Sequence, residues 1–133
     1  MRVLVVDDEP LILYGISRFL HGRAAVKTVA TAEEAIDEIV AQQCDLCFLD
    51  INLPGMTGLD AMKIINELSP TTKVAIMTGN ALDEAMKMQI EDAAYAFIEK
   101  PFSLLQIREV TERVTAALIE QDSLTGNPLP KSQ

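Results

Sequence analysis

The sequence predicts an α/β domain in which helices cover both faces of a doubly wound parallel sheet. Five short apolar runs alternate with five stretches whose apolar residues recur at helical spacing. Strands joined by such helices run parallel, and right-handed crossovers place the helices on both faces. The chain has 133 residues and a hydrophobic share of 49%, which is enough for one domain with a sizeable core.

The first half of the chain contains three predicted strands and two predicted helices. Residues 3–6 form a continuous run of apolar residues, which is typical of a strand buried on both faces. Pro10 opens the first helix, because proline suits the first helical position. Thr31 and Glu34 form a capping box at the start of the second helix. The predicted strands are 3–6, 25–29 and 46–49, and the apolar helix faces carry Ile12, Ile16, Phe19, Leu20, Ile36, Ile39 and Val40.

The second half continues the alternation. A helix is predicted over residues 58–68, and Ser69-Pro70 ends it. A helix with a weaker apolar face is predicted over residues 82–93, and Ser103 caps the last helix. The remaining strands are 74–77 and 96–98, and the apolar faces of the third and last helices carry Leu59, Met62, Ile65, Ile107, Val110, Val114 and Leu118.

Composition limits the class of protein. The net charge of −9 would repel phosphate backbones, which argues against nucleic-acid binding by this domain. No apolar run is long enough to span a membrane and the start shows no signal-peptide pattern, so a cytoplasmic protein is expected. Cys44 and Cys47 are predicted to be small core or boundary residues without a disulfide. The domain is expected to span residues 1–120, followed at 121–133 by a tail or the start of a linker.

Polar side chains follow four of the predicted strands at the point where each strand ends. The carboxyl ends of parallel strands meet at one edge of the sheet, where ligands bind, so we expect these side chains to share a pocket. Each of them alone also fits an ordinary strand end or turn, but their joint placement favours a functional site. These residues are Asp7, Asp8, Asp50, Thr78 and Lys100.

This set of side chains suits a cation and a phosphoryl group. Two like charges about 4 Å apart repel by roughly 4 kcal/mol at an effective dielectric constant of about 20. Three clustered carboxylates therefore need a cation unless one of them is protonated. A hard divalent ion with oxygen ligands, Mg²⁺ or Mn²⁺, is the natural partner. Lys100 can neutralise a phosphoryl group and Thr78 can donate a hydrogen bond to it, while Gly79 leaves space for an incoming group.

Four motifs stand in order, each at the end of a predicted strand. They are VVDDEP at 5–10, LDINLPGMTG at 49–58, MTG at 77–79 and KPF at 100–102. From residue 2 to residue 120 the chain resembles the receiver domain of two-component response regulators. The resemblance implies a flavodoxin-like fold with strand order 2-1-3-4-5. It also implies a protein of a phosphorelay, which a sensor histidine kinase or a phosphotransfer protein phosphorylates.

The resemblance assigns the acidic residues to phosphorylation and metal binding. Asp50 matches the phosphoacceptor. Asp8 matches the acid that contacts the metal directly, and Asp7 the acid that acts largely through water. Asn52 would offer its backbone carbonyl to the metal. The chain is then not an enzyme but a phosphoacceptor that assists its own metal-dependent phosphorylation and dephosphorylation.

The resemblance assigns other residues to activation. Lys100 would pair with the phosphoryl oxygens, and the peptide bond from Lys100 to Pro101 would be cis. Thr78 would move to bond a phosphoryl oxygen, and Phe97 would turn inward. The output partner, output domain or second copy would contact the fourth helix, the fifth strand and the last helix. Met88 and Leu105 fall away from the apolar faces of those helices.

Two other functions fit part of the pattern. A magnesium phosphatase of the haloacid dehalogenase type carries a second Asp two positions after its nucleophile, where this chain has Asn52. A pseudo-receiver that only binds proteins typically lacks an acid, the acceptor or the lysine, and all of these are present.

Three positions bear on the comparison with the family. Thr57 stands where the family often has Asp and is expected to affect only the loop. Ala93 stands where the family commonly has Gly, which would be costly if the turn required positive φ. Asn80 lies where a side chain can meet an attacking water.

Overall fold

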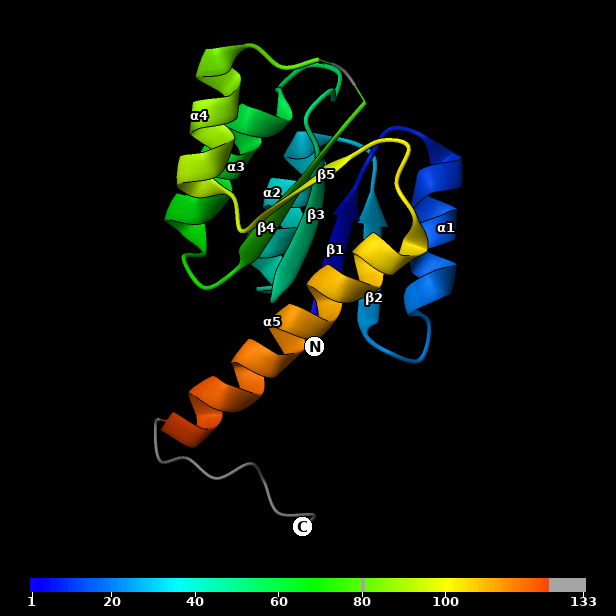
Figure 1. The fold of residues 1–133 in the computed structure, drawn as a ribbon, viewed down its shortest axis with the longest axis vertical. Coiled ribbons are helices and arrows are strands. Elements are labelled where there is room, and N and C mark those ends of the chain that lie inside the picture. The colour runs from blue at the N-terminus through cyan, green and yellow to red at the C-terminus, as the bar shows by residue number, and fades with distance from the viewer. Residues whose placement is uncertain (80, 125–133) are drawn as a thin grey trace.

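The computed structural model describes residues 1–79 and 81–124. Within them, five strands alternate with five helices, as the sequence predicts (Figure 1). The strands are β1 (Arg2–Val6), β2 (Ala25–Val29), β3 (Leu46–Asp50), β4 (Lys73–Thr78) and β5 (Ala96–Glu99), and the helices are α1 (Pro10–Leu20), α2 (Ala32–Ala41), α3 (Gly58–Leu68), α4 (Glu84–Ala93) and α5 (Leu104–Leu124).

The strands form one sheet in the order β2-β1-β3-β4-β5, and every neighbouring pair runs parallel. The predicted flavodoxin-like topology is therefore confirmed. The chain moves outward from β1 to β2 and then crosses back over β1 to β3, so the direction of winding reverses between β1 and β3. Ligands of such sheets bind beyond the carboxyl ends of the strands at this reversal, and β1 and β3 end there side by side.

Each face of the sheet has its own hydrophobic core, because successive residues of a strand point to opposite faces. In β1, Val3 and Val5 pack with α1 and α5, whereas Leu4 and Val6 pack with α2 and α3. Figure 1 shows α3 and α4 on the opposite side of the sheet from α1 and α5. Helices on both faces explain why β1 and β3 are apolar at almost every position.

Side-chain caps define where three helices begin. Thr31 accepts a hydrogen bond from the backbone N–H of Glu34, as the capping box predicts. Thr57 is the N-cap of α3, so the expectation that it affects only the loop was wrong. Asp83 caps α4, which therefore begins at Glu84, two residues later than predicted.

Val40 was expected on the apolar face of α2 but is exposed. The buried face of α2 consists of Ala32, Ala35 and Ile39. Val40 lies one residue beyond Ile39, which is a rotation of about 100° around the helix axis.

The end of α4 agrees with the predicted helix, whereas α5 extends further than expected. Ala94 follows α4 with φ −90°, so this turn needs no left-handed residue and Ala93 is unstrained. The helix α5 continues to Leu124, so residues 121–124 of the predicted tail are helical. Asn80 and residues 125–133 lie outside the described residues.

Cys44 and Cys47 are both buried and free, as predicted. Among residues 1–79 and 81–124, no helix has both the length and the apolar character needed to cross a bilayer.

Candidate functional site

Two buried carboxylates lie at the carboxyl ends of adjacent strands. Asp50 is the last residue of β3 and Asp7 directly follows β1, and both are almost fully buried. Backbone N–H groups stabilise them: Asn52 donates to Asp50 Oδ1 at 3.0 Å, and Glu9 donates to Asp7 Oδ1 at 2.9 Å. The apolar strands thus end on carboxylates that the backbone holds in place.

Lys100 joins the two buried carboxylates. Its backbone N–H donates to the carbonyl of Thr78 at 2.6 Å, which places it across the end of β4. Its Nζ lies 2.8 Å from Asp7 Oδ2 and 3.2 Å from Asp50 Oδ2. A third carboxylate oxygen, Glu9 Oε1, lies 3.4 Å from the same ammonium. We call Asp7, Asp8, Asp50 and Lys100 the acid pocket.

The pKa values of Asp7 and Lys100 are both raised, for different reasons. Burial raises the pKa of the Asp7 carboxyl and the charge of Asp50 adds to the effect, although hydrogen bonds from Lys100 and the Glu9 backbone oppose it. Burial would lower the pKa of Lys100, but its hydrogen bonds and charge interactions with Asp7 and Asp50 outweigh burial and raise it. Lys100 is therefore held as a cation between two acids.

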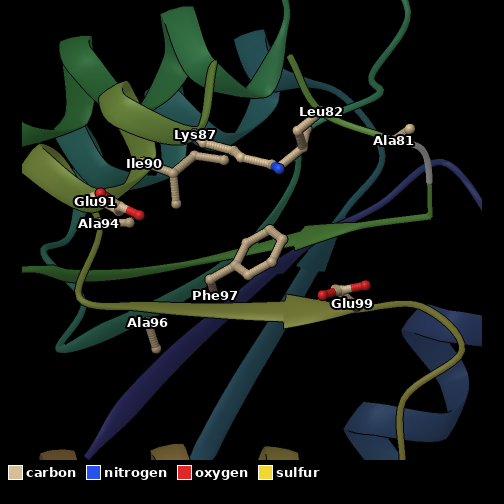
Figure 2. Close-up of a pocket in the computed structure, with 9 residues that line it drawn as sticks. All are labelled: Ala81, Leu82, Lys87, Ile90, Glu91, Ala94, Ala96, Phe97 and Glu99. Carbon is tan, nitrogen blue, oxygen red and sulfur yellow. The ribbon is translucent and has the colours of Figure 1, made fainter. Parts of the chain in front are cut away.

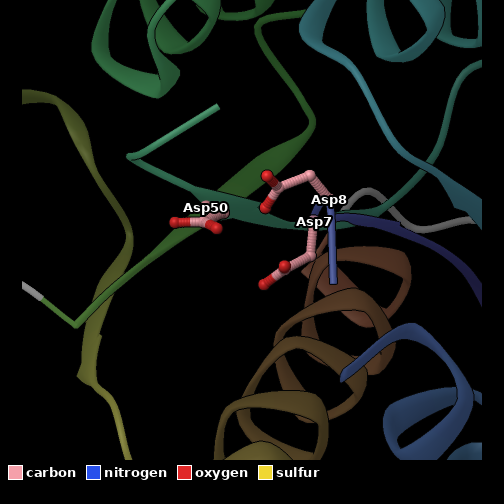
Figure 3. A group of neighbouring side chains, drawn as sticks. All are labelled: Asp7, Asp8 and Asp50. Atoms are coloured by element: carbon pink, nitrogen blue, oxygen red, sulfur yellow. The ribbon is translucent and has the colours of Figure 1, made fainter. Parts of the chain in front are cut away.

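Asp8 completes an acidic group that is open to solvent. One carboxylate oxygen from each of Asp7, Asp8 and Asp50 lies within 4.8 Å of the other two. Figure 3 shows these side chains gathered at the ends of β1 and β3. Asp8 is exposed, so an ion can reach the group and retain water ligands, as Mg²⁺ usually does. The donor set therefore fits the predicted Mg²⁺ or Mn²⁺.

Two glycines lie close to the pocket. Gly58, the first residue of α3, packs directly on the backbone that follows Asp50, and a Cβ there would lie only 2.6 Å from Ile51 Cα. A Cβ at Gly79 would meet the Lys100 side chain at 3.6 Å, which is an ordinary contact. The backbone beside Asp50 thus requires glycine at position 58, whereas the contacts of Gly79 in this structure do not require glycine.

Thr78 ends β4 beside the acid pocket, and its side chain is buried. In the sheet it stands opposite Glu99 of β5, one residue before Lys100. The Lys100–Pro101 peptide bond is cis, as expected. The movement of Thr78 toward a phosphoryl oxygen stays a prediction.

Phe97 lies outside the acid pocket. Its side chain is 40% exposed and lines a groove of about 480 Å³ between α4 and β5, together with Leu82, Lys87, Ile90 and others. Figure 2 shows the ring rising from β5 on the side of Lys87. The ring therefore faces outward, which is the arrangement from which the predicted inward turn would start. We call this cavity the α4–β5 groove.

The structure brings together Asp7, Asp8, Asp50 and Lys100, which the sequence predicts to share a pocket. Sequence reasoning did not include Glu9 or Gly58 in the site. The acidic run at the end of the first strand was a signal for Glu9, but its contact with Lys100 spans 91 residues. For Gly58, only the packing of α3 against β3 reveals the need for glycine.

Comparisons with known proteins agree with this geometry. The family described as the response regulator receiver domain matches residues 3–112. The chain belongs to the response regulator receiver family. A receiver domain is a signalling domain of two-component systems, and this family pairs with histidine kinases and output domains.

Individual relatives of the receiver domain are longer proteins or isolated domains. The nitrogen assimilation regulatory protein NtrX of Azorhizobium caulinodans is 35% identical over 119 residues, which cover 87% of this chain and 26% of the relative. A protein-glutamate methylesterase/protein-glutamine glutaminase of Syntrophus aciditrophicus is 33% identical over 106 residues, which cover 76% of this chain and 30% of the relative. The crystal structure of the receiver domain of NtrX from Brucella abortus has a TM-score of 0.76 at 33% identity, covering 84% of this chain and 96% of that one. The chain thus spans about a quarter to a third of these two longer relatives.

Proposed function

We propose that this receiver domain accepts a phosphoryl group on Asp50. The observation that carries the proposal is the setting of Asp50 at the end of β3. Lys100 Nζ lies 3.2 Å from its Oδ2, and oxygens of Asp7 and Asp8 lie close enough to share a divalent ion with it. Positive charge on both sides of the acceptor is what an incoming phosphoryl group requires, because phosphoryl transfer depends mainly on positioning and charge neutralisation.

In this step a carboxylate oxygen of Asp50 attacks the phosphorus of a phosphohistidine. The new O–P bond forms as the P–N bond breaks, and the imidazole leaves with the electron pair. Asp8, Asp50 and the Asn52 carbonyl would hold Mg²⁺ or Mn²⁺ directly and Asp7 largely through water, and the ion would supply charge neutralisation for the phosphoryl oxygens. Lys100 stabilises the remaining phosphoryl charge, and the Asn52 N–H keeps the acceptor carboxylate oriented.

The same residues assist the hydrolysis of the acyl phosphate. The domain then catalyses reactions only of its own Asp50, and the result is a change in its own conformation. A phosphatase of the haloacid dehalogenase type is not favoured, since Asn52 replaces the acid–base Asp and the receiver family matches residues 3–112. A pseudo-receiver is not favoured, because the acids and the lysine are present and lie together.

Phosphorylation controls the α4–β5 groove. A phosphoryl group on Asp50 draws the Thr78 hydroxyl toward it, and the vacated space lets Phe97 rotate inward. The output partner, an output domain or a second copy, docks on the surface of α4, β5 and α5, where Met88 and Leu105 are exposed as predicted. The phosphate biases an equilibrium between two forms that differ by about a few kcal/mol.

The phosphodonor docks on α1, beside the acid pocket. Leu11 in the first turn of α1 is 83% exposed, and Tyr14 on the next turn is also exposed. Gly15 follows them in the helix, and a Cβ there would meet nothing within 4 Å. Exposed apolar residues beside a helical glycine suit the close approach of a helix that carries the phosphohistidine.

The longer relatives support an output domain in the whole protein. The free, buried cysteines support a reducing, cytoplasmic location.

The deciding experiment is incubation with Mg²⁺ and acetyl phosphate, followed by intact-mass measurement. We expect the wild type to gain one phosphoryl group and Asp50→Asn to gain none. Asp60→Asn, which removes an exposed acid of α3, is the matched control and should label like the wild type. Equal labelling of Asp50→Asn would show that Asp50 is not the acceptor.

A further inference from the structure

Glu9 makes a contact that its place in α1 does not explain. It occupies the N-cap of α1, but its side chain makes no capping hydrogen bond, and Ser, Thr, Asp or Asn would suit that position better. Its Oε1 instead lies 3.4 Å from Lys100 Nζ. The Glu9 side chain is 63% exposed, so packing does not force it into this position.

The contact completes the partners of the Lys100 ammonium. An ammonium has three N–H donors, and three carboxylates, of Asp7, Asp50 and Glu9, surround this one. A phosphoryl group on Asp50 can take over the donor that Asp50 itself holds, but it can receive a second Lys100 donor only if Asp7 or Glu9 releases one. Glu9 is the most exposed of the three partners and the most distant, and it lies on the solvent side of the ammonium.

We propose that Glu9 is a positioning residue that holds the Lys100 ammonium toward solvent and competes with the phosphoryl group for it. This inference rests on the proposed phosphorylation of Asp50. By keeping one ammonium donor occupied, Glu9 slows transfer from a phosphodonor to Asp50. Exposed ion pairs are weak, so loss of the contact should raise the initial rate about two- to fivefold.

The test compares Glu9→Gln and Glu9→Asp with the wild type, using Mg²⁺ and acetyl phosphate. In the measured step the P–O bond to the acetyl group breaks, acetate leaves and Asp50 gains the phosphoryl group. Both variants should be phosphorylated faster. Gln removes the charge, whereas Asp keeps the charge but is one methylene shorter and is a favoured N-cap. Glu33→Gln removes an exposed charge from the first turn of α2 and should leave the rate unchanged.

A second measurement does not depend on phosphorylation. In the metal-free protein, the NMR signals of the Lys100 Hε and Cε atoms should shift in both Glu9 variants and stay in place in Glu33→Gln. Titration with Mg²⁺ alone should give the same Kd for all variants, because Glu9 is outside the acidic group formed by Asp7, Asp8 and Asp50.

Three outcomes would overturn the proposal. Wild-type rates in both Glu9 variants would show no competition, and a faster Glu9→Gln with an unchanged Glu9→Asp would show a general charge effect. A change in Mg²⁺ affinity that parallels the rates would show that Glu9 acts through the metal site. In all three cases labelling of Asp50 would still support the proposed function, whereas a wild type that gains no phosphate on Asp50 would refute both proposals.

Discussion

The acid pocket, where phosphorylation is proposed to occur, and the α4–β5 groove, which is proposed to respond to it, differ in the burial and hydrogen bonding of their side chains. In the acid pocket, Asp7 and Asp50 are buried, and each accepts hydrogen bonds from a backbone N–H and from Lys100. Beside the groove, Phe97 is 40% exposed, and Ile90 is the one residue of α4 that is fully buried.

This difference fits the separate tasks proposed for the two regions, phosphoryl transfer in the acid pocket and signalling at the α4–β5 groove. Transfer of a phosphoryl group needs groups held within a narrow range of positions, which strands and backbone hydrogen bonds supply. A signalling surface must change at a small cost in free energy, which suits a helix with few buried apolar contacts. The weak apolar face of α4, visible in the sequence, is therefore a feature of the proposed switch.

The largest effect should come from Gly58→Ala, which disturbs the backbone beside the acid pocket. The new Cβ would overlap the backbone at Asp50 and Ile51, and backbone atoms cannot move aside as a flexible side chain can. We expect a loss of about 3 kcal/mol in the free energy of unfolding, at the upper end of the usual cost of overpacking. Urea denaturation measures it.

The matched control is Gly15→Ala, where a Cβ would meet nothing within 4 Å on α1. This variant should be more stable than the wild type by about 0.5–1 kcal/mol, because alanine favours the helix. A Gly58→Ala protein as stable as the wild type would contradict the close packing of α3 on β3.

The second largest effect should come from Thr78→Ala, which removes the proposed coupling between the acid pocket and the α4–β5 groove. Asp8, Asp50 and Lys100 remain, so the variant should still accept phosphate. The coupling between Asp50 and the groove, on the order of 1–3 kcal/mol, should be lost because no hydroxyl moves toward the phosphate. Intact mass reports phosphorylation, and NMR shifts of residues 82–107 with beryllofluoride report the surface.

Thr78→Ser retains the hydroxyl and should respond like the wild type. Wild-type shifts in Thr78→Ala would show that the signal does not pass through Thr78, while Asp50 would remain the proposed acceptor.

The smallest effect should come from Asp7→Asn, which measures how much the buried Asp7 charge lowers the free energy of unfolding. The pKa of Asp7 is raised above its usual 3.8, mainly by burial. The folded state therefore binds this proton more readily than the unfolded state, and stability falls as pH rises from about 3.8 through the folded pKa. At pH 7, Asp7→Asn should raise the free energy of unfolding by about 0.5–2 kcal/mol, as is usual when a functional strain is removed.

Urea denaturation at several pH values tests this. The gain should shrink as pH falls below 3.8, where the wild-type carboxyl is neutral in both states. A loss of stability at pH 7 would show that the ion pair with Lys100 outweighs the burial of the charge.

Much of the fold was accessible from the sequence. Strand and helix periods and caps such as Thr31 are local signals, and they place all five strands within one residue at each end. The alternation of strands and helices along the chain then implies a parallel sheet. The strand ends indicate the pocket residues, and the resemblance carried by the four motifs implies the strand order. These inferences succeed because they depend on neighbours in the chain and on the rule that parallel strands end at one edge.

Other features depend on contacts between distant segments, and only the tertiary structure decided them. Val40 is exposed because α2 packs on the sheet through the face that carries Ala32, Ala35 and Ile39. Gly58 is required because α3 starts against the backbone of β3. Glu9 meets Lys100 because the segments that follow β1 and β5 lie at the same edge of the sheet and the long Lys100 side chain reaches across it. By itself the sequence determined which residues are candidates for the proposed chemistry, since residue type and strand-end position are properties of the chain. Distances, burial and the resulting pKa shifts were decided by the packed structure, because they depend on which atoms of other segments exclude water and supply hydrogen bonds.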